Sequence, residues 1–313
     1  MARIPIRRHA PAALALLVFA LLTGHALVPN AGPRLGSLLE TFLPWLGPAV
    51  PPLLLLVLLR RRTAAAVTAV LLPAVAWAWL FGPHLLPWRE SGQDLVVVQH
   101  NMSDENPDPA ATARALATSE PRPDLIALQE VTPAALPALR TALAADHPHH
   151  AVHGTVALFS RHALTDVRPV DIRPSGVDPS WQRALRATVR LPAHGGIAVH
   201  VAHLPSVRVS PTAGLTSARR DESARLLAAA LDAERSPRVL LLGDLNATLD
   251  DRGLDPLTSR LPAPVHGLSF TWPADLPVAR IDQVLARGAR GIAVEPLPPT
   301  ASDHLPLRAR IRL

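Results

Sequence analysis

The sequence predicts an α+β domain, in which one β-sheet packs on another, preceded by an N-terminal anchor of about three transmembrane helices. The first third of the chain contains three long apolar stretches without charged residues, which are typical of membrane spans. From Asp94 onward, short apolar runs alternate with amphipathic segments, which indicates strands interspersed with helices. We therefore predict a membrane anchor over residues 1–92 and one folded domain over residues 93–313, long enough for a single core.

The anchor is predicted from the stretches Ala12–Val28, Leu43–Leu59 and Ala64–Phe81. At 1.5 Å per residue the first would extend over roughly 26 Å, enough to cross a thin hydrocarbon core. The second contains prolines that would kink or break its first half, namely Pro44, Pro48, Pro51 and Pro52. Three spans are favoured. The alternatives are two spans with a re-entrant second segment, or a cleaved signal peptide followed by two spans.

The arginines of the anchor predict its orientation. Arg3, Arg7 and Arg8 precede the first apolar stretch, and Arg60–Arg62 separate the second stretch from the third. Because basic residues flank membrane spans on the cytoplasmic side, the N-terminus and the second arginine cluster are expected in the cytoplasm. An odd number of spans then places residues 93–313 on the extracytoplasmic side of the cell membrane.

The charge of the chain is concentrated in this anchor. The formal net charge is +6 and the sequence pI is about 11.3, and every basic residue is arginine. Residues 1–93 contain eight arginines and two glutamates, whereas residues 94–313 contain 23 arginines and 23 acidic residues. The folded domain is therefore neutral, which argues against a generally basic nucleic-acid-binding protein. The absence of cysteine excludes a disulfide scaffold, a thiolate metal site and a cysteine nucleophile.

Apolar runs and amphipathic periodicity locate the elements of the domain. The predicted strands are Leu95–Gln99, Leu125–Leu128, Thr155–Ser160, Ala184–Leu191, Ile197–Ala202, Val239–Leu242, Ile281–Ala286 and Leu307–Leu313. The predicted helices are Pro109–Thr118, Pro133–Ala144 and Ser217–Glu234. Many strands with helices inserted at intervals favour a mixed fold in which two sheets pack face to face.

Polar residues lie at the ends of six of these strands. A single carboxylate or amide after a strand is usually a turn residue, but a repeated pattern suggests that the strand ends converge on one polar pit. The residues in this pattern are Asn101, Gln129, Glu130, His203, Asp244, Asn246, Asp282, Ser302, Asp303 and His304.

Such a pit favours metal-assisted hydrolysis of a phosphoester. Its carboxylates and amide offer hard oxygen ligands, which suit Mg²⁺, Mn²⁺ or Ca²⁺ better than zinc. A divalent ion can neutralise a phosphoryl oxygen and orient an attacking water. His203 and His304 could donate a hydrogen bond or a proton, and Asp282 could hold one imidazole in the required tautomer.

Residues 94–313 resemble the endonuclease/exonuclease/phosphatase superfamily, which includes DNase I-like nucleases, sphingomyelinases and inositol-phosphate phosphatases. The matching motifs are HN (residues 100–101), LQE (128–130), ALFSRHAL (157–164), AHLPS (202–206), GDLNA (243–247), TWP with RIDQVL (271–285) and SDHLPL (302–307). The combination of GDLN, RID and SDH in this order is specific, whereas GDLN alone would be weak. The resemblance implies a four-layer αββα sandwich.

The resemblance also implies a metal site for Mg²⁺ or Mn²⁺. Glu130 would be the main metal ligand, with Asn101 and Asp303 close to the ion.

The implied catalytic residues are Asp244, Asn246, His304, Asp282 and His203. Asp244 would orient or deprotonate the attacking water, and Asn246 would bind the scissile phosphate. His304, steadied by Asp282, would contact the phosphate. His203 would act as a general acid or a transition-state hydrogen-bond donor.

One departure from the family narrows the substrate. The chain has no tyrosine, so the active-site tyrosine of the abasic-site endonucleases is absent and a role in DNA repair is disfavoured. The spans joined to this domain resemble a membrane-anchored bacterial subgroup that includes the teicoplanin-resistance (VanJ-type) proteins.

An anchored site favours a lipid-linked or headgroup phosphoester, because tethering raises the effective concentration of membrane substrates. The alternatives are an anchored extracellular nuclease and a phosphate-binding module without catalysis. The neutral charge of the domain and its few aromatic residues disfavour the nuclease. The binding module is disfavoured because no member of the constellation is missing. The sequence gives no basis for predicting an oligomeric state.

Three features of the domain are open to more than one interpretation. Arg219 and Arg220 could reach a substrate phosphate, although local pairing with acidic neighbours is favoured. Trp181 and Trp272 are equally suited to lining the pit and to packing in the core. The segment Val207–Thr216 is predicted to be a substrate-selecting loop.

Overall fold

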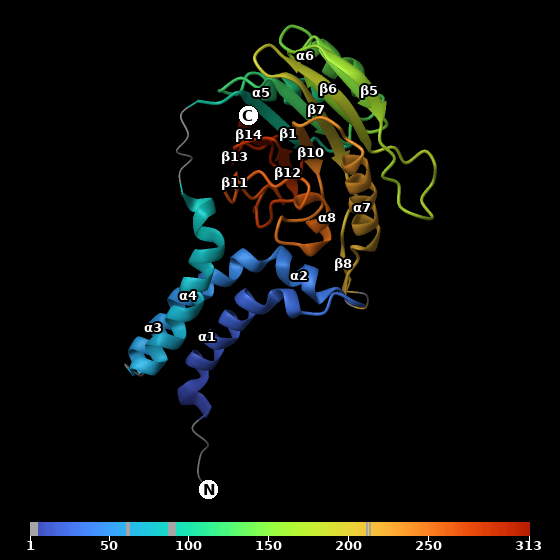
Figure 1. Ribbon diagram of the computed structural model, residues 1–313. Coiled ribbons are helices and arrows are strands. Elements are labelled where there is room, and N and C mark those ends of the chain that lie inside the picture. The colour runs from blue at the N-terminus through green and yellow to red at the C-terminus, as the bar shows by residue number, and fades with distance from the viewer. Residues whose placement is uncertain (1–5, 61–62, 87–91, 211, 213) are drawn as a thin grey trace.

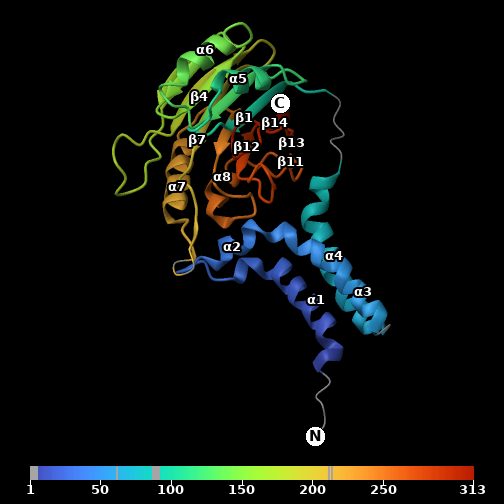
Figure 2. The same cartoon turned by 180° about the vertical axis from the view of Figure 1, so that it is seen from behind.

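A computed structural model describes residues 6–60, 63–86, 92–210, 212 and 214–313. Figure 1 shows a bundle of helices below a larger domain of strands and helices, and Figure 2 shows the same arrangement from behind. Arg3, Arg61 and Arg62, which contribute to the predicted orientation, lie outside the described residues. The join between the bundle and the first strand of the domain lies partly outside them as well.

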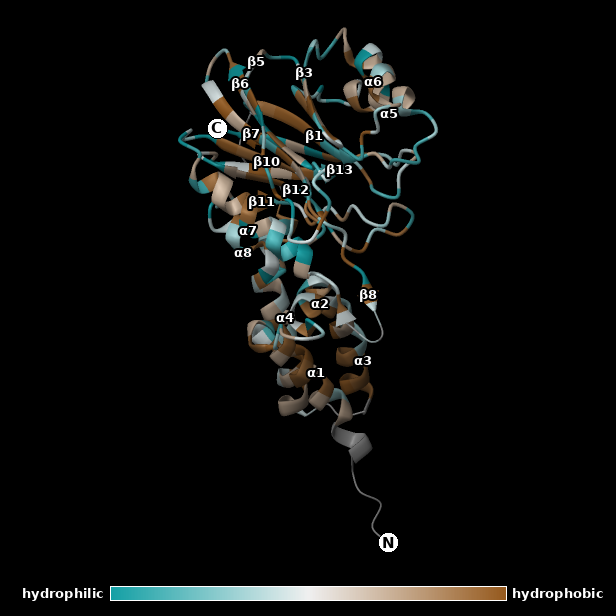
Figure 3. Cartoon of the chain, turned by 90° about the vertical axis from the view of Figure 1, so that its right-hand side faces the viewer, coloured by the Kyte–Doolittle hydropathy of each residue, from teal (hydrophilic) through white to brown (hydrophobic). Residues whose placement is uncertain are grey.

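Among residues 6–60 and 63–86, the N-terminal bundle consists of four α-helices and two short 3-10 helices. The α-helices are α1 (Ile6–Gly24), α2 (Leu35–Thr41), α3 (Val50–Arg60) and α4 (Ala64–Leu85), and the 3-10 helices are η1 (His25–Leu27) and η2 (Leu43–Ala49). Buried apolar side chains from α1, η2, α3 and α4 pack together in one cluster. Many apolar side chains on the outside of the bundle are exposed, as Figure 3 shows by the brown colour of these helices. Two segments, Ala10–Leu27 and Ala64–Leu85, are long and apolar enough to cross a membrane.

The second predicted span is broken, as its prolines suggested. Its first half forms the 3-10 helix η2, and α3 begins only at Val50. Helix α2 and the segment Leu43–Leu59 form a helix pair bent by 62°, which corresponds to a broken span or a re-entrant loop. The bundle therefore contains two helices long enough to span, or three spans if the bent pair counts as one.

Helix α2 docks on the folded domain. Glu40 of α2 is buried and accepts hydrogen bonds from Arg252, from Nη2 at 2.6 Å and from Nε at 2.9 Å. Ser37, one turn earlier, donates from Oγ to Oδ1 of Asp251 at 2.8 Å. Charge-assisted hydrogen bonds between buried partners are stronger than exposed pairs, so these contacts fix the polar side of α2 against the domain, while Leu39 packs on the apolar cluster of the bundle.

The domain contains two large β-sheets. One has seven strands in the order β11-β13-β14-β1-β2-β4-β3, and the other has five in the order β12-β10-β7-β6-β5. The strands of the first sheet are β1 (Leu95–Asn101), β2 (Leu125–Gln129), β3 (His149–His153), β4 (Val156–Ser160), β11 (Val265–His266), β13 (Gly291–Pro296) and β14 (Leu307–Arg312). Those of the second are β5 (Leu164–Pro169), β6 (Ala184–Leu191), β7 (Gly195–His203), β10 (Val239–Asp244) and β12 (Asp282–Arg287). A two-stranded ribbon adds β8 (Val209–Ser210) and β9 (Gly214–Leu215).

The domain has four layers. One apolar core, which includes Val97, Leu185 and Leu240, lies between the inner faces of the two sheets. A second core lies between the seven-stranded sheet and two helices, α5 (Pro109–Ala117) and α6 (Leu136–Leu143). A third lies between the five-stranded sheet and the helices α7 (Ala218–Asp232) and α8 (Asp255–Thr258). The predicted α+β fold with an αββα sandwich is confirmed.

Every strand and helix predicted for the domain is present, but several strands were not predicted. The edge strands β3 and β5 have mostly exposed or half-buried side chains, so they lack the apolar pattern that marks a strand in the sequence. Strand β13 begins at Gly291 and pairs with β14 on one side and with β11 on the other.

Strand pairing sets the position of the polar residues. Strands β1 and β2 are parallel, with Asn101 opposite Gln129, and β7 and β10 are parallel, with His203 opposite Asp244. Strand β12 runs antiparallel to β10 and places Asp282 opposite Asp244. The carboxyl ends of the parallel strands therefore bring polar residues from both sheets to one edge of the sandwich.

Candidate active site

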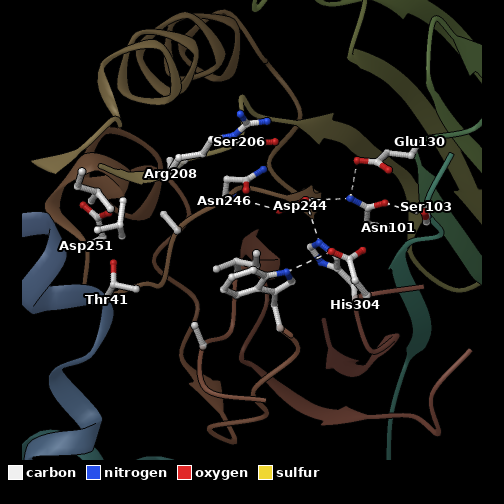
Figure 4. A pocket seen from close by; sticks show the side chains of 18 of the residues that line it. Thr41, Asn101, Ser103, Glu130, Ser206, Arg208, Asp244, Asn246, Asp251 and His304 are labelled. Carbon is white, nitrogen blue, oxygen red and sulfur yellow. Dashed lines mark hydrogen bonds and ion pairs between the residues drawn. The ribbon is translucent and has the colours of Figure 1, made fainter. Parts of the chain in front are cut away.

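Asn101 links the two sheets at this edge. It is buried at the end of β1, and its Nδ2 lies 3.1 Å from Oε1 of Glu130 and 3.1 Å from Oδ2 of Asp244 (Figure 4). Its Oδ1 accepts a hydrogen bond from the backbone of Ser103 at 3.1 Å. One amide group thus holds a carboxylate from each sheet.

Glu130 lies in a turn directly after β2. Its φ of 58° is in the left-handed region, which directs the side chain out of the line of the strand and into the pocket. The side chain is 29% exposed, and Oε2 accepts from the backbone N–H of Asp104 at 3.2 Å. Glu130 is therefore the most accessible carboxylate bonded to Asn101 and has lone pairs free for a cation.

Asp282 and His304 form a buried pair. The Nδ1 of His304 lies 2.8 Å from Oδ2 of Asp282, and Oδ1 of Asp282 accepts from Nε2 of Gln99 at 2.7 Å. Burial opposes the charged imidazole, but the carboxylates of Asp282 and Asp244 outweigh it and raise the pKa of His304 to about 10. His304 is thus held as an imidazolium, which can donate a hydrogen bond from Nε2. Gln99 was not predicted, because an amide inside a buried strand has no distinctive sequence signal.

Asp244 ends β10 at the centre of the cluster. Burial raises the pKa of its carboxyl to about 7, against the opposing effect of the His304 charge. Its Oδ1 accepts from the backbone N–H of Asn246 at 2.9 Å, and its Oδ2 accepts from Asn101. A carboxylate whose pKa lies near neutrality is suited to accept a proton from water.

Asn246 forms the turn after Asp244. Its φ is 50°, and its Nδ2 donates to the carbonyl oxygen of Leu204 at 2.9 Å. Its own carbonyl oxygen accepts from Nη1 of Arg220 at 3.2 Å. Arg220 is buried and also bonds to Asp221, so the prediction of local pairing is correct for this residue.

His203 is held as a neutral imidazole. Burial and the nearby Arg183 lower its pKa well below its usual value. The Nη1 of Arg183 lies 3.2 Å from Nδ1 of His203, and Nε2 of His203 lies 3.6 Å from Oδ2 of Asp244. A neutral ring suits the predicted role of hydrogen-bond donor better than that of general acid. Arg183 was not predicted, because only the pairing of β6 with β7 brings it beside His203.

Asp303 lies at the rim of the cluster. It is exposed, and its Oδ2 accepts from Nε1 of Trp272 at 3.3 Å. Within the described residues, no hydrogen bond or ion pair joins it to Glu130 or Asn101. The structure thus brings seven of the eight predicted site residues into one network and leaves Asp303 at its edge.

The residues present fit a divalent cation in two ways. Glu130, beside Asn101, presents accessible carboxylate oxygens. Asp244, Asp282 and His304 also form a group whose possible ligand atoms all lie within 4.8 Å of one another. In that second group both oxygens of Asp282 and Nδ1 of His304 are already hydrogen-bonded, so the Glu130 side offers the more available oxygens.

The cluster opens into a pocket of about 1080 Å³. Its walls include Trp272 and four residues of the predicted substrate-selecting loop, Val207, Arg208, Val209 and Leu215. Thr41 and Phe42 line the same pocket, and Figure 4 shows Thr41 on the side opposite the catalytic cluster. The pocket is therefore enclosed by the folded domain and by the end of helix α2.

Residues 98–304 match the endonuclease/exonuclease/phosphatase family. This chain belongs to that family. Its members are phosphoester hydrolases, and many depend on a divalent metal. No curated protein matches the chain by sequence. The resemblance to the VanJ-type subgroup stays a prediction.

Solved structures show the same fold. Sphingomyelinase C from Streptomyces griseocarneus superposes with a TM-score of 0.57 at 20% identity, covering 70% of this chain and 99% of that one. Beta toxin from Staphylococcus aureus has a TM-score of 0.57 at 16% identity, with coverage of 69% and 99%. A mannosyl-6-phosphatase from Bacteroides thetaiotaomicron has a TM-score of 0.55 at 16% identity, with coverage of 70% and 100%. At these identities the likeness concerns the fold.

Proposed function

We propose that this protein is a membrane-anchored, extracytoplasmic phosphoester hydrolase that depends on Mg²⁺ or Mn²⁺ and acts on a lipid-linked or headgroup phosphoester. The observation that carries this proposal is the composition of the pocket. The side chains suited to phosphoester hydrolysis and two residues at the end of helix α2, Thr41 and Phe42, line the same cavity. A substrate held in the membrane would reach such a cavity without leaving the membrane, because the anchor keeps the cavity close to the membrane surface.

A divalent ion held beside Glu130 and Asn101 would neutralise charge on the phosphoryl group. A structure of a beta toxin mutant from Staphylococcus aureus contains bound magnesium ions, which supports Mg²⁺ as the ion in this protein. The remaining chemistry belongs to the side chains. Asp244 accepts a proton from the attacking water, as the bond from the water oxygen to phosphorus forms and the bond to the leaving oxygen breaks.

The other side chains orient and stabilise the phosphate. His304, charged and steadied by Asp282, donates a hydrogen bond to a phosphoryl oxygen, where negative charge develops. Neutral His203 donates a hydrogen bond from Nε2 to the phosphoryl group in the transition state. The turn at Asn246, whose carbonyl oxygen accepts from Arg220 of α7, completes the side of the pocket toward that helix.

The arrangement of the bundle supports the proposed topology. Figure 1 shows the N-terminal end of α1 and the C-terminal end of α3 together, at the end of the bundle remote from the domain. The predicted cytoplasmic arginine clusters belong to these ends. A reporter enzyme that is active only outside the cytoplasm, fused after Leu313, should be active in intact cells. Activity of a cytoplasm-specific reporter at the same position would contradict the topology.

The substrate class can be tested with the full chain purified in detergent. We expect Mg²⁺-dependent release of product from mixed micelles that contain a phospholipid or a polyprenyl phosphoester, and at most slow cleavage of plasmid DNA. Bis(4-nitrophenyl) phosphate serves as a soluble substrate without a lipid chain. Cleavage of DNA at a higher kcat/KM than that of every lipid substrate would favour the nuclease. If none of the substrates is turned over in a metal-dependent way, both enzyme functions are contradicted.

A further inference from the structure

A second pocket of about 600 Å³ adjoins the active-site pocket. The two pockets share Ser206, Arg208 and Leu215 as lining residues, so they are parts of one cleft. Their charges differ. The active-site part is lined by six acidic residues and one arginine, whereas the second part, among the described residues that line it, has four arginines and no acidic residue.

The four arginines come from separate parts of the chain: Arg34 before helix α2, Arg183 before β6, Arg208 in the loop after β7, and Arg219 in α7. Arg34 is paired with a carboxylate, the Oδ2 of Asp221 at 2.5 Å. The other three form no ion pair with any residue that the structure describes. Arg183 is half-buried, and Arg208 and Arg219 are exposed, so an anion that enters the cavity can reach these unpaired cations.

Two of these arginines are directed by other contacts. The guanidinium of Arg183 lies over the ring of Trp181, 5.1 Å from its centroid, and contacts His203 of the active site. Arg183 therefore connects the lining of the second pocket with the catalytic cluster. The backbone of Arg208 is held by Thr216, through a 3.1 Å bond from its N–H to Oγ1. The contacts of Arg183 therefore orient its guanidinium group, that of Arg208 fixes only its backbone, and both residues line the second pocket.

The first turn of α7 reinforces the positive charge. Ser217, Ala218 and Arg219 line the second pocket at the start of this helix of 15 residues. The Oγ of Ser217 bonds to Asp221 and does not cap the helix. The unbonded N–H groups of the first turn carry partial positive charge, which adds to that of the arginines.

We propose that this arginine pocket binds a second phosphate-type anion of the substrate, beside the phosphoester that reacts in the acidic part of the cleft. The inference rests on the proposed hydrolase function and narrows its substrate to phosphoesters that carry a further anionic group. Arginine suits this role because its planar guanidinium can bond two phosphate oxygens at once. The acidic part of the cleft requires a metal to accept a phosphate, whereas the arginine pocket accepts one without a metal.

The binding step can be measured without catalysis. Inorganic phosphate is titrated into the full chain in detergent and EDTA, and tryptophan fluorescence is followed because Trp181 lines the pocket. We expect a saturable change that is absent in Trp181→Phe. Arg219→Ala should weaken phosphate binding about tenfold. Arg225→Ala, an exposed arginine of the same helix outside the pocket, should leave it unchanged.

A second arm distinguishes a lipid headgroup from free phosphate. The kcat/KM for phosphatidylinositol 4-phosphate is compared with that for phosphatidylinositol in mixed micelles, since the two differ by one phosphate away from the phosphodiester. Arg219→Ala should lower the first value about tenfold more than the second. Equal effects on both lipids, or phosphate binding that is absent or insensitive to Arg219→Ala, would overturn the proposal. Failure of hydrolysis with phosphate binding retained would contradict only the proposed enzyme.

Discussion

Asp244→Asn should lower the kcat for every substrate of this protein by about 10³-fold, the contribution typical of a positioned general base. Asparagine has nearly the same shape as aspartate but cannot accept the proton of the attacking water. Asp244 is suited to that task because burial raises the pKa of its carboxyl to about 7 while Asn101 and the backbone of Asn246 hold both oxygens in place. The measurement is kcat at saturating Mg²⁺ with the full chain in detergent.

A matched control separates the loss of a base from a general effect on the fold. Asp232→Asn removes an aspartate of α7 that pairs with Arg260 on the surface, 2.7 Å from Oδ1 to Nε, away from the pocket. This variant should retain the kcat of the wild type, because an exposed ion pair contributes little to stability. A decrease of less than threefold for Asp244→Asn in a folded protein would show that another group activates the water.

Glu130→Gln should raise the Mg²⁺ concentration needed for half-maximal activity by about 100-fold or more. The change removes the charge of the most accessible carboxylate bonded to Asn101, and a divalent cation depends on anionic oxygen ligands for affinity. Activity should be abolished by EDTA in the wild type and restored by excess Mg²⁺. In the variant, excess Mg²⁺ should restore only part of it. The measurement is the rate as a function of free Mg²⁺.

A parallel variant tests the position of the metal. Asp303→Asn should shift the Mg²⁺ dependence less than Glu130→Gln does, because Asp303 lies at the exposed rim and, among the described residues, its carboxylate bonds only to Trp272. A larger shift for Asp303→Asn would place the ion nearer to the rim. An unchanged Mg²⁺ dependence in Glu130→Gln would favour the buried group of Asp244, Asp282 and His304 as the ligands.

The positions of Asn101, Asp244 and His203 at the active site could be predicted because each follows an apolar run that can only be a buried strand. Parallel pairing of β1 with β2 and of β7 with β10 then brings these strand ends to one edge of the sandwich. The order of the polar residues along the chain, together with the family resemblance, was sufficient to predict the αββα fold. The predicted break of the second apolar stretch followed from prolines alone, since they cannot continue a helix.

Other features depend on contacts between segments that are far apart in the sequence. Arg183 reaches His203 only through the pairing of β6 with β7, and Gln99 supports Asp282 only across the two sheets. The neutral state of His203 likewise follows from burial and from that arginine, neither of which a single sequence position indicates.

The sequence alone therefore determined the strands, the polar strand ends and the separation of a basic N-terminal segment from a neutral domain, because these depend on local apolar patterns and on residue type. The tertiary structure decided that helix α2 docks on the domain, that Thr41 and Phe42 close the active-site pocket, and that four distant arginines surround one cavity. Such arrangements result from the packing of whole elements, in which long side chains from different segments meet, and the spacing of residues along the chain carries no record of them.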